Sequence, residues 1–395
     1  MYARVTRAAV LSALTVFSYV VLAGQQSAPA ISALNRLFRD PLQANWFAPT
    51  MLAQVPMERL ELIVKGLLDT NGVVTSVQPA EDGRFLVVFK KASVPTQITL
   101  DTEGRITGLF FAPPVPNKQT VDAVLPEFAR LPGRVSVTVT ENGRARAGFQ
   151  SDRSLAVGSS FKLAILAALA EQVSNKTRGW NDVVLLRPEW KSLPSGVLQG
   201  WPDGTPLTLA ALANQMISIS DNTAADGLLD IAGRQAVERQ APRNRPFLTS
   251  RQMFILKADG NTELLRRYQS ADEGNRRLLL KDIDSRPLPA AAQIRRVPTA
   301  LDVEWFFTTD ELCGLIEKVA GLPAFRINPG LVDPSAWGEV AFKGGSEPGV
   351  LNLTTALKSK SGRQYCVAAT WNDDSPVDEN RFATLYRFLL AALDN

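Results

Sequence analysis

The 395-residue sequence contains no histidine, and this absence excludes several common catalytic sites. Without an imidazole, the chain can form neither a Ser-His-Asp triad nor a Cys-His pair nor a histidine-ligated zinc site. The sequence also has no Cys-x-x-Cys pair and no P-loop signature. Proton transfer must therefore depend on lysine, carboxylate or tyrosine side chains, or on water.

Cysteine is also scarce, since the chain has only Cys313 and Cys366. The first lies in a helix-like segment and the second in a strand-like segment. An even count in an exported protein is compatible with a disulfide. Two buried free thiols are the alternative, and the sequence leaves both open.

The sequence has little excess charge of either sign. Lys and Arg number 43 and Asp and Glu 39, a formal net charge of +4. Two of the positive charges, Arg4 and Arg7, lie at the extreme N-terminus. A small and evenly spread excess of this kind does not indicate nucleic-acid binding. We expect a mixed, solvated surface and no nucleic-acid partner.

Long apolar runs are absent except near the N-terminus. The basic start "MYARVTR" precedes an uncharged apolar run over residues 8–24, and "QQSAPA" then places Ala28 and Ala30 in an A-x-A arrangement. This order is typical of a secretory signal peptide, predicted here over residues 1–30. An uncleaved membrane anchor is the alternative. After cleavage we expect an exported, periplasmic or extracellular protein with no membrane span.

A small α+β domain is predicted over residues 31–115. The amphipathic run "MERLELIVKGLLDTNG" is closed by Asn71-Gly72, and four strand-like segments follow it, separated by turn signals such as Thr102-Glu103-Gly104. The proline-containing connector "PPVPNKQ" then indicates a boundary. The second domain is predicted over residues 116–395.

Both ends of the second domain are strand-like. At the start, a predicted helix at 121–130 is followed by a hairpin that turns at Asn142-Gly143. Near the end there are three strand-like segments, "GEVAFKGG", "GVLNLTTALKS" and "RQYCVAATWN", and a last amphipathic helix follows them. Helical patterns dominate residues 180–300. We therefore expect an α/β (α+β) fold with a five-stranded antiparallel sheet, built from two early and three late strands and flanked by helices.

The stretch "VGSSFKLAIL" places Ser159 three residues before Lys162. Residues at this spacing share one face of a helix, so the two side chains can meet. Gly158 suits a tight entry to the helix, where the backbone N–H of Ser159 is free to stabilise an oxyanion. A lysine at the edge of an apolar core can have a lowered pKa and act as a base. A capping serine beside a solvated lysine is the alternative interpretation.

Two further motifs follow in the sequence. Ser220-Asp221-Asn222 offers a hydroxyl that can relay a proton between two lysines, and an asparagine that can bind the first lysine and a substrate amide. Lys343-Gly344-Gly345 ends a strand-like segment, where glycines let a substrate approach the backbone closely. A helix N-cap or turn, and a simple hairpin, are the respective structural alternatives.

In this order, the three motifs resemble SxxK, SDN and KTG of class A β-lactamases and penicillin-binding proteins. The resemblance covers residues from about 121 to 395. The first interval between motifs is similar to class A, whereas the interval from 220 to 343 is longer and implies an insertion.

The resemblance implies an acyl-enzyme mechanism without metal or cofactor. It implies that Ser159 is the nucleophile, that Lys162 is the general base or part of its relay, and that Ser220 is a proton shuttle. It also implies that Asn222 holds a substrate amide, that Lys343 binds a carboxylate and completes the relay, and that Gly345 lies against the substrate. The implied oxyanion hole consists of the N–H groups of Ser159 and Ser346. The implied substrates are small-molecule or peptidoglycan-derived acyl compounds. Hydrolysis of a β-lactam or a related amide or ester is expected. D,D-peptidase or esterase activity, or non-catalytic binding of β-lactams or cell-wall fragments, are the alternatives.

Two departures from the family pattern concern substrate recognition and turnover. Gly344 lacks the hydroxyl that usually follows the second lysine, which weakens the expected carboxylate recognition. No E-x-x-L-N loop supplies a deacylating glutamate, and Glu263, Glu273 and Glu304 in the interval lack its flanking residues. The sequence thus predicts acylation and leaves efficient β-lactam turnover open.

The small domain resembles the NTF2/steroid-isomerase-like modules that precede some β-lactamase-like hydrolases. The resemblance depends on the order of elements and on "WFAP" and "GRITGLFFAPP". It implies either a ligand-binding cavity or a positioning domain beside the active site.

Overall fold

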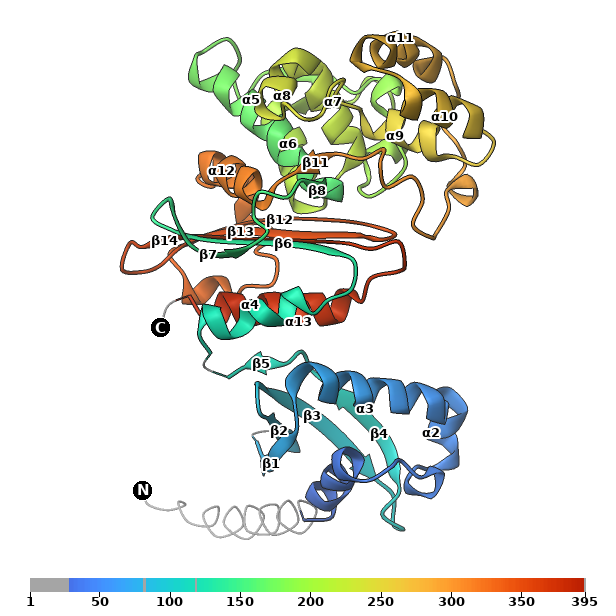
Figure 1. Cartoon of the computed structure of the whole chain (residues 1–395), viewed down its shortest axis with the longest axis vertical. Coiled ribbons are helices and arrows are strands. Elements are labelled where there is room, and N and C mark those ends of the chain that lie inside the picture. Colours follow the sequence, from blue (N-terminus) through green and yellow to red (C-terminus); the bar gives the residue numbers. More distant parts are fainter. Residues whose placement is uncertain (1–27, 81–82, 118, 394–395) are drawn as a thin grey trace, which may run out of the picture. The chain divides into compact units, whose positions relative to one another are not determined.

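The computed structural model describes residues 28–80, 83–117 and 119–393. The chain divides into two compact units, Met1–Gln119 and Thr120–Asn395, and each is considered by itself (Figure 1). The apolar run on which the predicted signal peptide depends lies outside the described residues. The last residues of the predicted signal peptide are described. Ala28 and Ala30 belong to a helix over residues 28–39, and Ala30 packs in the core of the first unit.

The first unit contains helices that pack on an antiparallel sheet. Its elements are α2 (Pro49–Gln54), α3 (Met57–Asn71), β1 (Val74–Pro79), β2 (Phe85–Phe89), β3 (Ala92–Leu100), β4 (Ile106–Phe111) and β5 (Val115–Pro116). The strands β1 to β4 lie in sequence order, as the turn signals predict, and β5 pairs with β3. Strand β5 thus occupies part of the expected connector. Gly72, at a φ of 82°, ends α3 as the Asn-Gly pair predicts.

The second unit is built around a five-stranded antiparallel sheet. Its strands are β6 (Arg134–Glu141), β7 (Arg144–Phe149), β12 (Glu339–Glu347), β13 (Val350–Lys358) and β14 (Gln364–Asn372), in the order β12-β13-β14-β6-β7. This confirms the predicted sheet of two early and three late strands. Helices α4 (Val121–Ala129) and α13 (Glu379–Ala391) cover one face, and α12 (Thr309–Val319) lies on the other (Figure 1).

Most helices of this unit lie on the side of α12 (Figure 1). They are α5 (Lys162–Ser174), α6 (Leu209–Ser218), α7 (Asn222–Ala232), α8 (Arg234–Gln240), α9 (Ser250–Lys257), α10 (Thr262–Ser270) and α11 (Glu273–Asp284). Two short strand pairs join them, β8 (Leu155–Ala156) with β11 (Phe306–Phe307) and β9 (Val183–Leu185) with β10 (Pro206–Thr208). Residues 163–169 of α5 are all buried, as expected of a helix that is apolar on every face.

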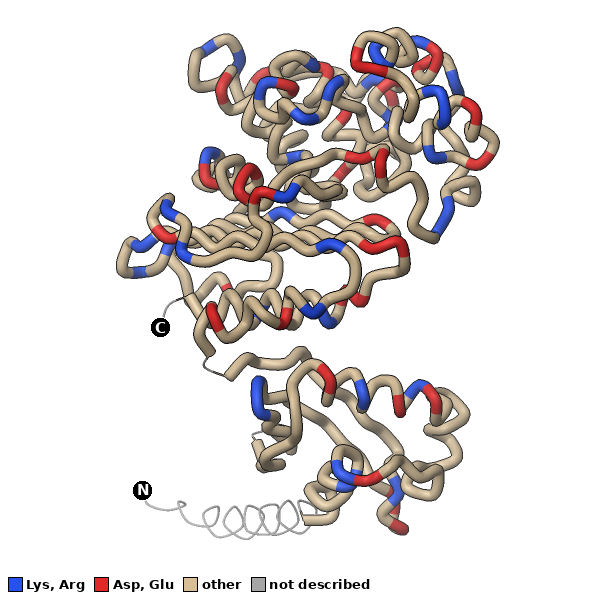
Figure 2. The backbone as a smooth tube through the Cα atoms, viewed as in Figure 1, with Lys and Arg blue, Asp and Glu red and all other residues tan. Residues whose placement is uncertain are grey.

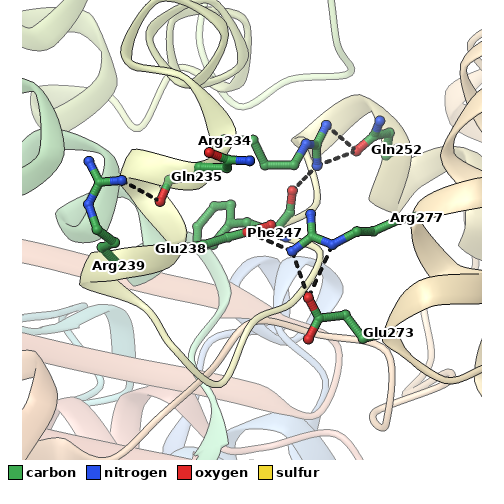
Figure 3. Close-up of polar contacts among 8 residues, drawn as sticks. All are labelled: Arg234, Gln235, Glu238, Arg239, Phe247, Gln252, Glu273 and Arg277. Carbon is green, nitrogen blue, oxygen red and sulfur yellow. Dashed lines mark hydrogen bonds and ion pairs between the residues drawn. The ribbon is translucent and has the colours of Figure 1, made fainter.

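Helices α10 and α11 lengthen the interval between the second and third motifs. Arg277 on α11 binds Glu238 on α8 at 2.7 Å and also Glu273, one helical turn away (Figure 3). The buried carboxylate of Glu238 accepts a second hydrogen bond, from the backbone N–H of Phe247 at 3.1 Å. An ion pair that is anchored at its buried end holds this pair of helices to the rest of the unit.

The structure answers the question of the two cysteines, because Cys313 on α12 and Cys366 on β14 form a disulfide. Acidic and basic residues alternate along the described chain, without a large region of one sign (Figure 2). Among residues 28–80, 83–117 and 119–393, no helix is long and apolar enough to cross a membrane.

Candidate active site

Ser159 lies in a tight turn directly before α5. The turn is a 3-10 helix over Gly158–Phe161, and α5 begins at Lys162, whereas the sequence predicts a single α-helix through both residues. Side chains three residues apart eclipse one another in a 3-10 helix, so the tighter turn brings Ser159 and Lys162 closer together. Gly158 has a φ of 49°, which a glycine adopts without strain.

Strand β12 packs its backbone directly against this turn. A Cβ on Gly345 would lie 2.1 Å from the carbonyl oxygen of Val157 and 2.5 Å from the nitrogen of Ser159, and a Cβ on Gly158 would lie 3.0 Å from the nitrogen of Ser346. The absence of side chains at both glycines therefore permits the close approach. It brings the backbone nitrogens of Ser159 and Ser346 to the same junction.

The amine of Lys162 has four neighbours and is fully buried. Its Nζ lies 3.2 Å from Oγ of Ser159, 2.6 Å from the carbonyl oxygen of Ser220, 3.0 Å from Oγ of Ser220 and 2.6 Å from Oδ1 of Asn222. Nδ2 of Asn222 donates to the carbonyl oxygen of Leu193 at 2.9 Å, which turns its Oδ1 toward the lysine. The structure thus brings together the four residues of the first two motifs that were predicted to interact.

The surroundings of Lys162 favour a neutral amine. Burial lowers the pKa of Lys162 well below its usual value, and the charge of Lys343 lowers it further. A neutral amine has two N–H groups, and the carbonyl of Ser220 and Oδ1 of Asn222, both at 2.6 Å, can accept them. The lone pair is then free for the hydroxyl proton of Ser159.

Ser220 connects the two lysines. Its Oγ lies 3.0 Å from Nζ of Lys162 and 3.0 Å from Nζ of Lys343, within hydrogen-bond distance of both amines. Ser220 has a φ of 59°, an uncommon conformation for a residue with a side chain. Asp221 stabilises this turn, because its carboxylate caps α7 at Ala224 and accepts the backbone N–H of Val197 at 2.7 Å.

Lys343 lies on β12 and is 3% exposed. Burial lowers the pKa of Lys343 to about 7, so the side chain changes charge near neutral pH. Besides Ser220, it donates to the carbonyl oxygen of Gly344.

The residue after Lys343 has no room for a hydroxyl-bearing side chain without rearrangement. A Cβ on Gly344 would lie 3.0 Å from Cζ of Phe342, and a Cβ on Gly330 would lie 2.3 Å from Cγ of the same ring. A side chain at residue 344 would therefore press on the phenyl ring of Phe342, which would have to move by a few tenths of an ångström.

The site around Ser159 opens onto a cavity of about 510 Å³. Ser159, Ser220, Asn222 and Ser346 contribute polar atoms, while its apolar wall includes Phe161, Met253, Phe254, Trp305, Leu351 and Leu353. The indole of Trp305 stacks on Phe161 at a ring separation of 3.8 Å, which supports the turn that carries Ser159.

Three residues of this site were not predicted from the sequence. Ser195 donates from its Oγ to the carbonyl of Ser220 at 2.7 Å, and Lys257 and Glu347 line the cavity as an ion pair at 3.3 Å. Of these three residues, only Glu347 could have been predicted from the sequence, because it directly follows Ser346, the residue after the third motif. Lys257 and Ser195 belong to no motif, and only the fold brings them to the cavity.

Comparisons with known proteins agree with this fold. The profile of the family described as "Beta-lactamase enzyme family" matches residues 116–257. Among solved structures, a β-lactamase from Sphaerobacter thermophilus is similar at 21% identity and a TM-score of 0.49, covering 69% of this chain and 95% of that one. PBP-A is similar at 15% identity and a TM-score of 0.47, covering 70% and 97%. No curated protein matches the sequence. The match to the family profile, together with the observed antiparallel sheet and its flanking helices, identifies the larger unit as a β-lactamase/transpeptidase-like α+β fold.

Proposed function

We propose that the chain is an exported serine hydrolase that forms an acyl-enzyme through Ser159. The observation that carries this proposal is the buried amine of Lys162, 3.2 Å from Oγ of Ser159, with a lowered pKa and its two N–H groups accounted for. A neutral amine at this position can take the hydroxyl proton as the serine attacks a carbonyl carbon.

The remaining residues support the later stages of acylation. The backbone N–H groups of Ser159 and Ser346 stabilise the oxyanion, an interaction of which a single donor typically contributes about 2.7–4 kcal/mol. The proton taken by Lys162 passes through Oγ of Ser220 to the leaving nitrogen or oxygen, and the bond from that atom to the carbonyl carbon breaks. The hydrogen bonds at 3.0 Å on both sides of Ser220 support this route.

The cavity fits a small acyl compound that carries a carboxylate. Lys343, when protonated, attracts the carboxylate, and Asn222 retains one N–H for a substrate amide. A β-lactam or a related amide or ester has these groups. The missing hydroxyl at Gly344 favours an esterase among the alternatives, because the carboxylate of a β-lactam or of a terminal D-alanine would lose one hydrogen bond there.

Covalent labelling tests the proposal. A fluorescent penicillin and a fluorophosphonate should each label the protein at one site, with the corresponding mass increase, and Ser159→Ala should abolish both labels. Ser270→Ala, on the exposed surface of α10, is the matched control and should be labelled as the wild type is. Equal labelling of Ser159→Ala would overturn the proposal, and reversible binding with no mass increase would indicate a non-catalytic binder.

Substrate assays distinguish the alternatives within this class. Decay of a chromogenic cephalosporin would support β-lactam hydrolysis. Release of D-alanine from a peptide, or of a chromophore from an ester, without cephalosporin decay would instead support the peptidase or esterase.

We also propose the division into a leader over residues 1–30, an NTF2-like module over residues 31–115 and the hydrolase domain over residues 116–395. N-terminal sequencing of the protein secreted by an expressing cell tests the first boundary. A chain that begins at Ile31 supports it, and a chain that retains the apolar run supports the membrane anchor.

A further inference from the structure

A charged cluster of three side chains lies at one side of the cavity. Lys257, at the end of α9, forms ion pairs with Glu304 and, at 3.3 Å, with Glu347 at the end of β12. The side chains of Lys257 and Glu304 are 10% and 0% exposed, whereas that of Glu347 is 27% exposed and lines the cavity. Two carboxylates therefore share one ammonium in a largely buried place.

The surroundings of the buried carboxylate of Glu304 disfavour its charged form. Burial, reinforced by the negative charge of Glu347, raises the pKa of Glu304 well above its usual value, and Oε2 of Glu304 has no hydrogen-bond partner. Burial opposes the charge of Lys257, but the two carboxylates outweigh it and raise the pKa of the ammonium. Of the two carboxylates, Glu347 is the one that faces the cavity.

Glu347 also lies on the side of the reacting groups. It follows Ser346, whose backbone nitrogen lies beside the turn of Ser159. The negative charge of Glu347 raises the pKa of the buried amine of Lys162, although burial lowers that pKa by more. Among the residues that the structure describes, Glu347 is the one carboxylate that lines this cavity.

From this placement we propose that Glu347 is the general base that activates water for hydrolysis of the Ser159 ester. The inference rests on the proposed acyl-enzyme. The water oxygen forms a bond to the ester carbonyl carbon, and one water proton passes to the carboxylate of Glu347. The bond from that carbon to Oγ of Ser159 then breaks, and Oγ takes a solvent proton that is relayed through Ser220 and Lys162. Glu347 returns its proton to solvent, so that the net reaction consumes one water and releases a carboxylic acid.

The lifetime of the acyl-enzyme tests this assignment. Wild type and Glu347→Gln are labelled to completion with a fluorescent penicillin, excess label is removed, and loss of the label is followed by intact-protein mass. We expect full labelling of both and release slower by about 10²–10⁴-fold in Glu347→Gln, which is the usual contribution of a general base. Glu339→Gln is the matched control, on the same strand and paired with the exposed Lys358, and should release the label at the wild-type rate.

The possible failures are distinguishable. A wild type that takes no label overturns the proposed function. A labelled wild type that never releases the acyl group, or Glu347→Gln with the wild-type lifetime, overturns the role of Glu347 and leaves acylation intact. If Glu347→Gln does not fold, Glu347→Asp decides, since it keeps a negative charge beside Lys257 but withdraws the carboxylate by one methylene. Slower release from Glu347→Asp supports catalysis, and an unchanged lifetime shows a structural ion pair only.

Discussion

Nζ of Lys162 lies 2.6 Å from Oδ1 of Asn222 and 3.2 Å from Oγ of Ser159, and the lysine is fully buried. In this chain without histidine, the asparagine and the carbonyl of Ser220 orient the amine that we propose as the base. They bind its N–H groups, and the lone pair is left facing the serine. The orientation of the base is therefore a property of its neighbours, and each neighbour can be tested.

Replacing the base with a permanently charged side chain should abolish acylation while the fold persists. Lys162→Arg keeps a positive charge, but the guanidinium does not lose its proton in the working pH range. We expect labelling by a fluorescent penicillin to slow by about 10²–10⁴-fold. The matched control is Lys358→Arg on β13, which is part of an exposed ion pair and should be labelled at the wild-type rate. Normal labelling of Lys162→Arg would remove the lysine from the mechanism.

Substrate binding should depend on pH through Lys343. Burial lowers the pKa of this ammonium to about 7, so the side chain is charged below that pH and neutral above it. We expect KM for a substrate with a carboxylate to increase as pH rises through about 7, because the attracting charge is lost. KM for a neutral ester serves as the control and should not follow this titration. The same increase for both substrates would contradict the role assigned to Lys343.

Gly345→Ala should slow acylation more than the addition of a single methyl group would suggest. The new methyl group would meet the carbonyl oxygen of Val157 at 2.1 Å and the nitrogen of Ser159 at 2.5 Å, both of them backbone atoms. Either β12 or the serine turn must move, and misplacement by about 1 Å can cost about 10²-fold in rate. We expect a corresponding loss of labelling rate, measured beside Gly314→Ala. That control lies on α12 with nothing within 4 Å of the added methyl. Wild-type labelling of Gly345→Ala would show that the contact is not needed.

The disulfide should stabilise the domain without taking part in the reaction. Cys313 and Cys366 are 53 residues apart, and a bridge over this separation lowers the entropy of the unfolded chain by an amount equivalent to about 4 kcal/mol. We expect the double variant Cys313→Ala, Cys366→Ala to lose roughly 2–4 kcal/mol of unfolding free energy in denaturant titrations. Its labelling rate at 25 °C should stay within a few-fold of the wild type. An unchanged denaturation midpoint would show that the bridge adds no stability.

Much of the fold was predictable because its signals are local. Alternation of apolar residues and the turn at Asn142-Gly143 predict β6 and β7, and the apolar faces of residues 163–169 predict the buried helix α5. The 3-10 geometry of the Ser159 turn was not predicted. It depends on the backbone of β12, almost two hundred residues later, packing against Gly158.

The sequence by itself determined which chemistry is open to this chain. It has no histidine, and three short motifs in a recognisable order left lysine as the candidate base. The tertiary structure decided the state of that lysine, since burial and the charge of Lys343 act through space and lower its pKa. It also decided the partners of Glu347, because Lys257 and Glu304 are far from it in the chain and contact it only in the folded protein. Motifs record which residues are present, whereas desolvation and charge coupling depend on distances that only packing sets.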